Sequence, residues 1–115
     1  WPGAPANEPL SVYAMWAIVS RPGMEGVVHS HNGLVSGAYY VDAGDSGADF
    51  GGDFTIHGPG GETLQKITPV AGQLLLFPST LRHGVERYTG KRPRIVVSFN
   101  LRASSDTRPD HRLDR

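Results

Sequence analysis

Three histidines in this chain have the residue type and the spacing that a metal site requires. His29 and His31 are separated by one residue, and His83 lies much further along, just past the apolar run at 74–77. Imidazole nitrogens are the commonest protein ligands of divalent transition metals, and residues two apart in a strand point to the same side. The pattern therefore predicts a mononuclear metal site that leaves coordination positions open for substrate.

The two remaining histidines show no comparable pattern. His57 lies beside a Gly/Pro-rich turn, and His111 lies near the end of the chain. A lone histidine is more often structural or exposed than a ligand, so we predict that neither one binds the metal.

Short strands are predicted to bring the three histidines together. The 15 glycines and 9 prolines fall between short apolar runs, and no segment sustains a helical period. About eight strands are expected, at 11–20, 27–31, 36–42, within 50–57, 64–68, 73–77, 84–88 and 94–101. Antiparallel strands of this number and length suit an all-β jelly roll, also called a double-stranded β-helix.

The chain is expected to form one domain. Its 115 residues allow a single modest core. We expect one double-stranded β-helix domain over residues 1–101, followed by a polar, mobile tail over 102–115 in which charged residues alternate with Ser and Pro. The chain begins at Trp1 without an initiator Met, which is compatible with the C-terminal part of a longer protein.

The composition excludes several classes of function. Lys plus Arg and Asp plus Glu number 11 each, so no net field recruits nucleic acid or an anionic membrane. The absence of cysteine excludes disulfides, a thiol nucleophile and thiolate-bound metals. No apolar stretch approaches the roughly 18 residues needed to span a bilayer, and no signal peptide is visible. We expect a cytoplasmic protein that acts on a small molecule or a peptide, with no nucleic-acid or membrane partner and an oligomeric state that the sequence leaves open.

Two strands indicate which side chains meet the interior. The run at 73–77 is apolar almost throughout, as in a strand buried on both faces. Leu74 and Leu76 from this run, together with Val96, are candidates for apolar walls of a pocket. In the strand at 94–101, alternation predicts a core face made of Ile95, Val97, Phe99 and Leu101. The opposite face carries Arg94, Val96, Ser98 and Asn100. This polar face either meets solvent or lines a cavity in which Arg94 binds a carboxylate and Ser98 adds a hydroxyl.

Taken together, these motifs resemble a known family. They are Trp16, HSH at 29–31 followed by SGAYYV at 36–41, PVAGQLLLFPS at 69–79 leading to HGV at 83–85, and RIVVSFN at 94–100. The segment 16–100 resembles the iron(II)- and 2-oxoglutarate-dependent oxygenases of the double-stranded β-helix class, in particular a bacterial and phage branch. The combination is specific, although each motif alone is weak.

The resemblance implies roles for individual residues. His29 would be the first iron ligand, His83 the distal one, and Arg94 the partner of the far carboxylate of 2-oxoglutarate. Ser98 and Tyr40 would add hydroxyls to that carboxylate. Tyr39 and Tyr40 point to opposite faces, so only one of them can line the pocket, and we favour Tyr40. The implied activity is a dioxygenase that converts 2-oxoglutarate to succinate and carbon dioxide while hydroxylating an unidentified substrate, with no catalytic residue beyond the metal ligands.

One position departs from the wider superfamily, which uses HxD or HxE where this chain has His31. A neutral imidazole leaves the site one unit more positive, which favours the 2-oxoglutarate dianion and alters the redox behaviour of the iron. Three outcomes stay open. His31 completes a working iron site, which we favour; an aspartate such as Asp42 or Asp45 takes the position; or the site binds metal without turnover.

Two other classes of protein fit parts of the pattern. Cupin-type metalloenzymes share the fold and often use three histidines without 2-oxoglutarate. They usually place a glutamate shortly after the HxH pair, however, and residues 32–41 contain none. A non-catalytic β-sandwich binding module, with incidental histidines, is the third hypothesis.

Overall fold

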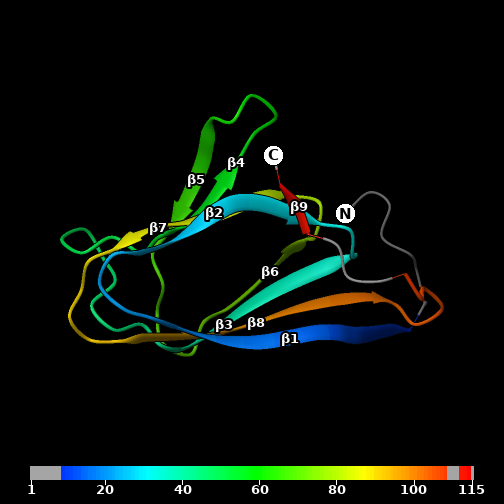
Figure 1. Ribbon diagram of the computed structural model, residues 1–115, viewed down its shortest axis with the longest axis horizontal. Helices are drawn as coiled ribbons and strands as arrows, with labels where there is room; N and C mark the ends of the chain where they lie inside the picture. The colour runs from blue at the N-terminus through cyan, green and yellow to red at the C-terminus, as the bar shows by residue number, and fades with distance from the viewer. Residues whose placement is uncertain (1–8, 109–111, 115) are drawn as a thin grey trace.

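Two antiparallel sheets face each other in the computed structural model, which describes residues 9–108 and 112–114 (Figure 1). The described residues form no helix, and so none that could cross a membrane. The nine strands of these residues are β1 (Leu10–Ser20), β2 (Met24–His31), β3 (Val35–Asp42), β4 (Phe54–His57), β5 (Thr63–Ile67), β6 (Leu74–Pro78), β7 (Arg82–Tyr88), β8 (Arg94–Ala103) and β9 (Arg112–Asp114).

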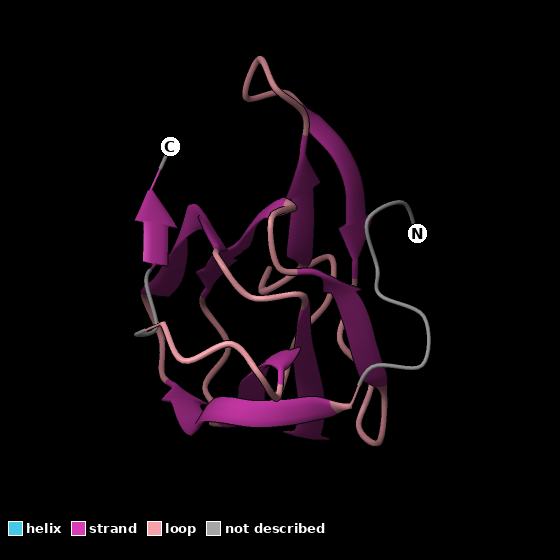
Figure 2. Cartoon of the chain, turned by 90° about the vertical axis from the view of Figure 1, so that its right-hand side faces the viewer, coloured by secondary structure: helices cyan, strands magenta, loops and turns pink. Residues whose placement is uncertain are grey.

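Except at the β4–β5 hairpin, consecutive strands alternate between the two sheets, as in a jelly roll. The first sheet has the order β1-β8-β3-β6, and the second has the order β5-β4-β7-β2-β9. The β4–β5 hairpin projects away from the sandwich (Figure 2). The predicted all-β double-stranded β-helix is confirmed, and β1 to β8 correspond to the expected strands.

The last part of the chain adds strand structure to the stretch predicted as a tail. β8 runs on to Ala103, and β9 pairs with β2 through its backbone. The mobility of residues 102–115 and the boundary at residue 101 stay predictions.

The side of β8 that is buried differs from the predicted one. The face expected to be core is only half-buried, whereas Arg94, Val96 and Asn100 are 3%, 6% and 1% exposed. The reason is tertiary: the second sheet closes over the polar side of β8, and alternation alone does not specify which side is covered. The polar face therefore lines the interior, as the second of the two interpretations had it.

The burial of β6 also differs from the prediction. Leu74 and Leu76 are 51% and 56% exposed, so β6 is not buried on both faces and these two residues do not wall the pocket. Instead, Phe77 is buried, and Leu75 packs against a small apolar cluster. That cluster consists of Ala38, Tyr40 and Val96, with Ile18 beside it.

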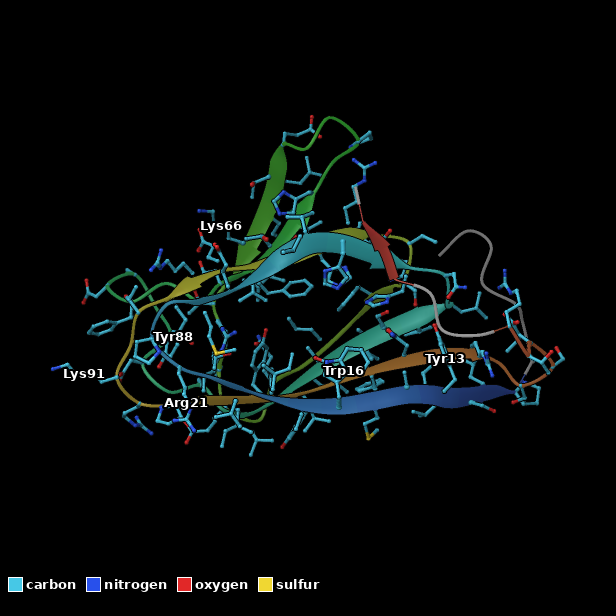
Figure 3. All side chains as sticks on the ribbon, in the orientation of Figure 1. Tyr13, Trp16, Arg21, Lys66, Tyr88 and Lys91 are labelled. Carbon is cyan, nitrogen blue, oxygen red and sulfur yellow. The ribbon has the colours of Figure 1, made fainter. Side chains whose placement is uncertain are left out.

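Tyr88 anchors one end of the sandwich, where Figure 3 shows it beside the turn that follows β7. Its side chain is fully buried, and its hydroxyl donates to the carbonyl of Arg92 and accepts from the amide of Asp45 at 2.7 Å. Gly44, at φ +56°, has no room for a Cβ, which would come within 2.5 Å of this hydroxyl. Tyr88 thereby ties the loop after β3 to the turn before β8.

We expect Tyr88→Phe to lower the free energy of unfolding by about 1–3 kcal/mol, because two backbone groups lose their buried partner. Chemical denaturation with the matched variant Tyr39→Phe measures this effect. Tyr39 is 41% exposed, so its variant should be as stable as the unaltered chain. Equal stability of both variants would show that the Tyr88 hydroxyl does not hold the loop.

Candidate metal centre and anion pocket

The three predicted histidines lie together between the sheets. His29 and His31 come from one face of β2, and His83 lies opposite His29 on the neighbouring strand β7. One ring nitrogen from each lies within 4.8 Å of the other two. The ring centroids are 4.5 Å apart for His29 and His83, 4.9 Å for His29 and His31, and 5.8 Å for His31 and His83. These distances allow three imidazoles to bind one ion.

Hydrogen bonds fix two of these rings in the tautomer that a metal needs. The Nδ1 atom of His29 lies 2.5 Å from the carbonyl of Val27, and that of His83 lies 2.8 Å from the carbonyl of Leu81. A carbonyl only accepts, so each Nδ1 donates and each Nε2 carries the lone pair. Neutral imidazole nitrogens on one side of an ion, with other positions open, suit iron(II) as well as zinc, copper or nickel.

A chain of buried polar side chains supports the third ring. The amide nitrogen of Asn100 lies 3.5 Å from Nδ1 of His31, Ser36 donates to the amide oxygen at 2.6 Å, and the hydroxyls of Ser36 and Ser79 are 2.9 Å apart. All four residues are at most 5% exposed. Rotating the carboxamide by 180° lets Nδ1 of His31 donate to the Asn100 oxygen and turns the amide nitrogen toward Ser36, which then accepts from it and donates to Ser79. In this arrangement His31 has the same tautomer as the other two rings.

Sequence reasoning missed the roles of Asn100, Ser36 and Ser79. The available indication was the place of Asn100 on the polar face of β8. Ser36 joins it only through the pairing of β3 with β8, which opposes the two residues.

Aromatic side chains restrict the histidine rings further. Phe77 lies 4.6 Å and Phe54 5.7 Å from the ring of His83, and both phenylalanines are buried. Trp16 rises from β1 into the space between the sheets (Figure 3), with its ring 6.4 Å from His31. The candidate ligands are therefore held by packing as well as by hydrogen bonds.

One cavity of about 530 Å³ contains all six of the predicted site residues. Arg94, Tyr40 and Ser98 line it together with the three histidines. Tyr40 is 2% exposed, and burial raises the pKa of its hydroxyl, while the nearby Arg94 acts in the opposite direction. Tyr39 lies on the other face of β3, as alternation predicted. The roles assigned to these residues remain predictions.

Arg94 is a buried cation without a carboxylate partner among the described residues. Its Nη1 donates to the carbonyl of Gly52 at 2.5 Å, its Nη2 lies 3.5 Å from the hydroxyl of Ser20, and its Nε has no partner. The guanidinium carbon lies 5.5 Å from the centre of the Tyr88 ring, and burial lowers the pKa of Arg94. An unpaired buried charge is costly, so a bound anion would stabilise this arrangement.

The other candidate ligands are engaged elsewhere. Asp42 accepts from the amide of Gly44, and Asp45 accepts from the amides of Lys91 and Arg92. Among the described residues, the histidine cluster includes no carboxylate, which favours His31 over an aspartate as the third ligand. His57 lies outside the cluster with its Nε2 2.8 Å from the Thr55 hydroxyl, and His111 lies outside the described residues.

Alanine at His29, His31 or His83 should weaken cobalt(II) binding by more than about 100-fold, a larger loss than removal of an outer hydrogen bond causes. His57→Ala is the matched control and should bind cobalt like the unaltered chain. Anaerobic calorimetry measures the affinities, and full affinity in His83→Ala would disprove the three-histidine site.

Asn100→Ala should weaken cobalt(II) binding by about 10- to 100-fold, because His31 loses the group that orients it. Asn100→Asp should keep the affinity, since a carboxylate still accepts from Nδ1 of His31. Ser98→Ala, two residues away on the same face of β8, is the control for nonspecific disruption of this strand and should keep the affinity for cobalt(II). If Asn100→Asp bound as weakly as Asn100→Ala, Asn100 would not accept from His31.

Comparison with known proteins places the fold and the family. No curated protein matches the chain significantly. Among solved structures, an uncharacterised protein with a double-stranded β-helix domain from Klebsiella pneumoniae has a TM-score of 0.59 and 16% identity, with 97% of this chain and 90% of that chain covered. A cupin domain from Bordetella pertussis has a TM-score of 0.53 and 15% identity over 84% of this chain and 94% of that one.

A variant of oxalate decarboxylase from Bacillus subtilis gives a TM-score of 0.57 and 20% identity. The match covers 93% of this chain and only 25% of that one, so this chain spans about a quarter of its length. Likeness at these identities concerns the fold. The model of the family described as "Putative 2OG-Fe(II) oxygenase" matches residues 14–100, a span that includes the three histidines and Arg94. The chain therefore belongs to the 2OG-Fe(II) oxygenase family.

Proposed function

We propose that this chain is the catalytic domain of an iron(II)- and 2-oxoglutarate-dependent dioxygenase that hydroxylates an unidentified substrate and forms succinate and carbon dioxide. The observation that carries the proposal is the buried guanidinium of Arg94 in the cavity that also contains three converging imidazoles. One group suits a carboxylate and the other suits a divalent metal. 2-Oxoglutarate needs both, because one end chelates the iron and the other end is a carboxylate.

In this proposal Arg94 binds the far carboxylate. Its planar fork matches a carboxylate in two hydrogen bonds, and its Nε is without a partner among the described residues. Tyr40 and Ser98 line the same cavity and are assigned to donate hydroxyl hydrogens to that carboxylate. The three neutral imidazoles add no negative charge, which favours a dianionic ligand.

Iron(II), with 2-oxoglutarate and dioxygen bound, would supply the oxidising chemistry. The chain's own part is to orient the ligands and to exclude water. Ile18, Phe77 and Val96 line the cavity with apolar surface and serve the second task. The proposal places the reaction in the cytoplasm, on a small-molecule or peptide substrate.

A cupin-type metalloenzyme that does not use 2-oxoglutarate is the second candidate. The specific observation in its favour is the cluster of three histidines, which includes no carboxylate from the residues that the structure describes. In that case Arg94 would bind the carboxylate of the substrate itself, and 2-oxoglutarate would have no effect on the protein.

Anaerobic titration with iron(II) and 2-oxoglutarate should give the weak visible charge-transfer band of the chelate and should raise the melting temperature. Arg94→Ala should abolish the band at moderate 2-oxoglutarate concentration but leave metal binding intact, because Arg94 holds the ligand and not the metal. Arg92→Ala, whose side chain is 65% exposed, removes a neighbouring arginine and should keep the band.

Two results would contradict the assignment in different ways. A band that persists unchanged in Arg94→Ala would remove Arg94 from its role. Metal binding with no effect of 2-oxoglutarate on melting would favour the cupin-type enzyme, since a ligand that binds only the folded state must raise its stability.

A further inference from the structure

The first sheet has an apolar outer face that no described strand covers (Figure 1). Pairing of β1, β8, β3 and β6 aligns its outward side chains in rows across the sheet. One row joins Met15, Phe99, Gly37 and Leu76, and the next joins Ala17, Val97, Tyr39 and Leu74. We call this surface the outer face. Strand alternation places its side chains on the side of the sheet opposite to Arg94, Tyr40 and Ser98, although Gly37 and Phe99 also border the cavity.

The outer face exposes a large apolar area, and its two central rows carry no charged residue. Seven of its large apolar side chains are 41% to 60% exposed: Val12, Met15, Val19, Tyr39, Val41, Leu74 and Leu76. None of the residues in the two central rows is charged. An aromatic side chain has roughly 150–250 Å² of surface and an aliphatic one somewhat less, so with its half-buried neighbours the outer face exposes on the order of 600–800 Å² of apolar area. The patch therefore reaches or exceeds the largest one found on a typical monomer.

The sequence pattern of these strands is that of buried strands. β6 is apolar on both faces, and the outward residues of β8 are Ile95, Val97, Phe99 and Leu101. In an antiparallel sheet with one face in solvent, the side chains on that face are normally polar. The outward side chains of these strands are apolar instead. At the centre of the outer face the ring of Phe99 lies over Gly37, where a Cβ would come within 2.1 Å of it. The face is thus filled with apolar groups although no part of the chain that the structure describes covers it.

We propose that the outer face is the interface of a homodimer, in which a second copy of this chain packs its own outer face against it. The exposed apolar area of the outer face is close to the roughly 800 Å² that each partner buries in a stable protein–protein interface. A second copy of this chain would therefore cover it. The lack of charge fits a second copy as well, since a two-fold axis places a patch against itself and would bring like charges together. Two such faces would stack as sheets about 10 Å apart, as in a β-sandwich.

This dimer leaves the candidate site accessible. Arg94, Ser98 and Tyr40 point to the inner side of the sheet, whereas the proposed contact uses the residues between them in sequence. Dimerisation therefore uses no side chain assigned to metal or 2-oxoglutarate binding, and it does not depend on the proposed function.

Sedimentation velocity of the unaltered chain tests the proposal and should give twice the chain mass of 12.4 kDa. Leu76→Lys and Met15→Lys each place a charge in the central row and should raise the dimer dissociation constant by at least about 100-fold. Leu64→Lys is the matched control: Leu64 is 63% exposed but lies on β5, outside the outer face, so this variant should stay dimeric. Circular dichroism and cobalt(II) binding verify that each variant is folded.

Two outcomes would overturn the proposal. A mass of 12.4 kDa at concentrations up to about 100 μM would mean that a different partner or another part of the chain covers the outer face. A dimer that persists in folded Leu76→Lys and Met15→Lys would mean that the copies associate through another surface.

Discussion

The structure depends on the burial of a guanidinium that no described carboxylate neutralises. Arg94 lies between the sheets without a carboxylate partner among the described residues, held by the Gly52 carbonyl and stacked beside Tyr88. A charge in that position prevents the interior from closing into an ordinary apolar core. The cavity that Arg94 lines and the small size of the apolar cluster around Tyr40 agree with this constraint.

The same constraint accounts for the distribution of apolar residues over the first sheet. Because polar groups occupy much of its inner face, many of its apolar side chains lie on the outer face. A domain that buries so few large side chains gains little stability from its interior. Packing of the outer face against a second copy would supply apolar burial that the interior lacks.

The sequence predicted the strands well, since glycine and proline turns separate short apolar runs. It also predicted the meeting of His29, His31 and His83, because two lie on one strand face and the third follows a strand that pairs nearby. The prediction of which face of β8 and of β6 is buried was wrong for the proposed core face of β8 and for Leu74 and Leu76, and it left the polar face of β8 undecided. Alternation defines two faces of a strand but does not say which one another sheet covers. The support of His31 by Asn100, Ser36 and Ser79 was missed, since strand pairing brings these residues together from distant parts of the chain.

The central claim is that one cavity holds a metal ion on three histidines and a carboxylate on Arg94. A crystal structure of the protein with manganese(II) and 2-oxoglutarate, grown without oxygen, tests it most directly. The account predicts one ion bound to Nε2 of His29, His31 and His83, chelated by the oxo acid end of the ligand, with the far carboxylate on the guanidinium of Arg94. An ion bound elsewhere, or a 2-oxoglutarate carboxylate that does not contact Arg94, would contradict it.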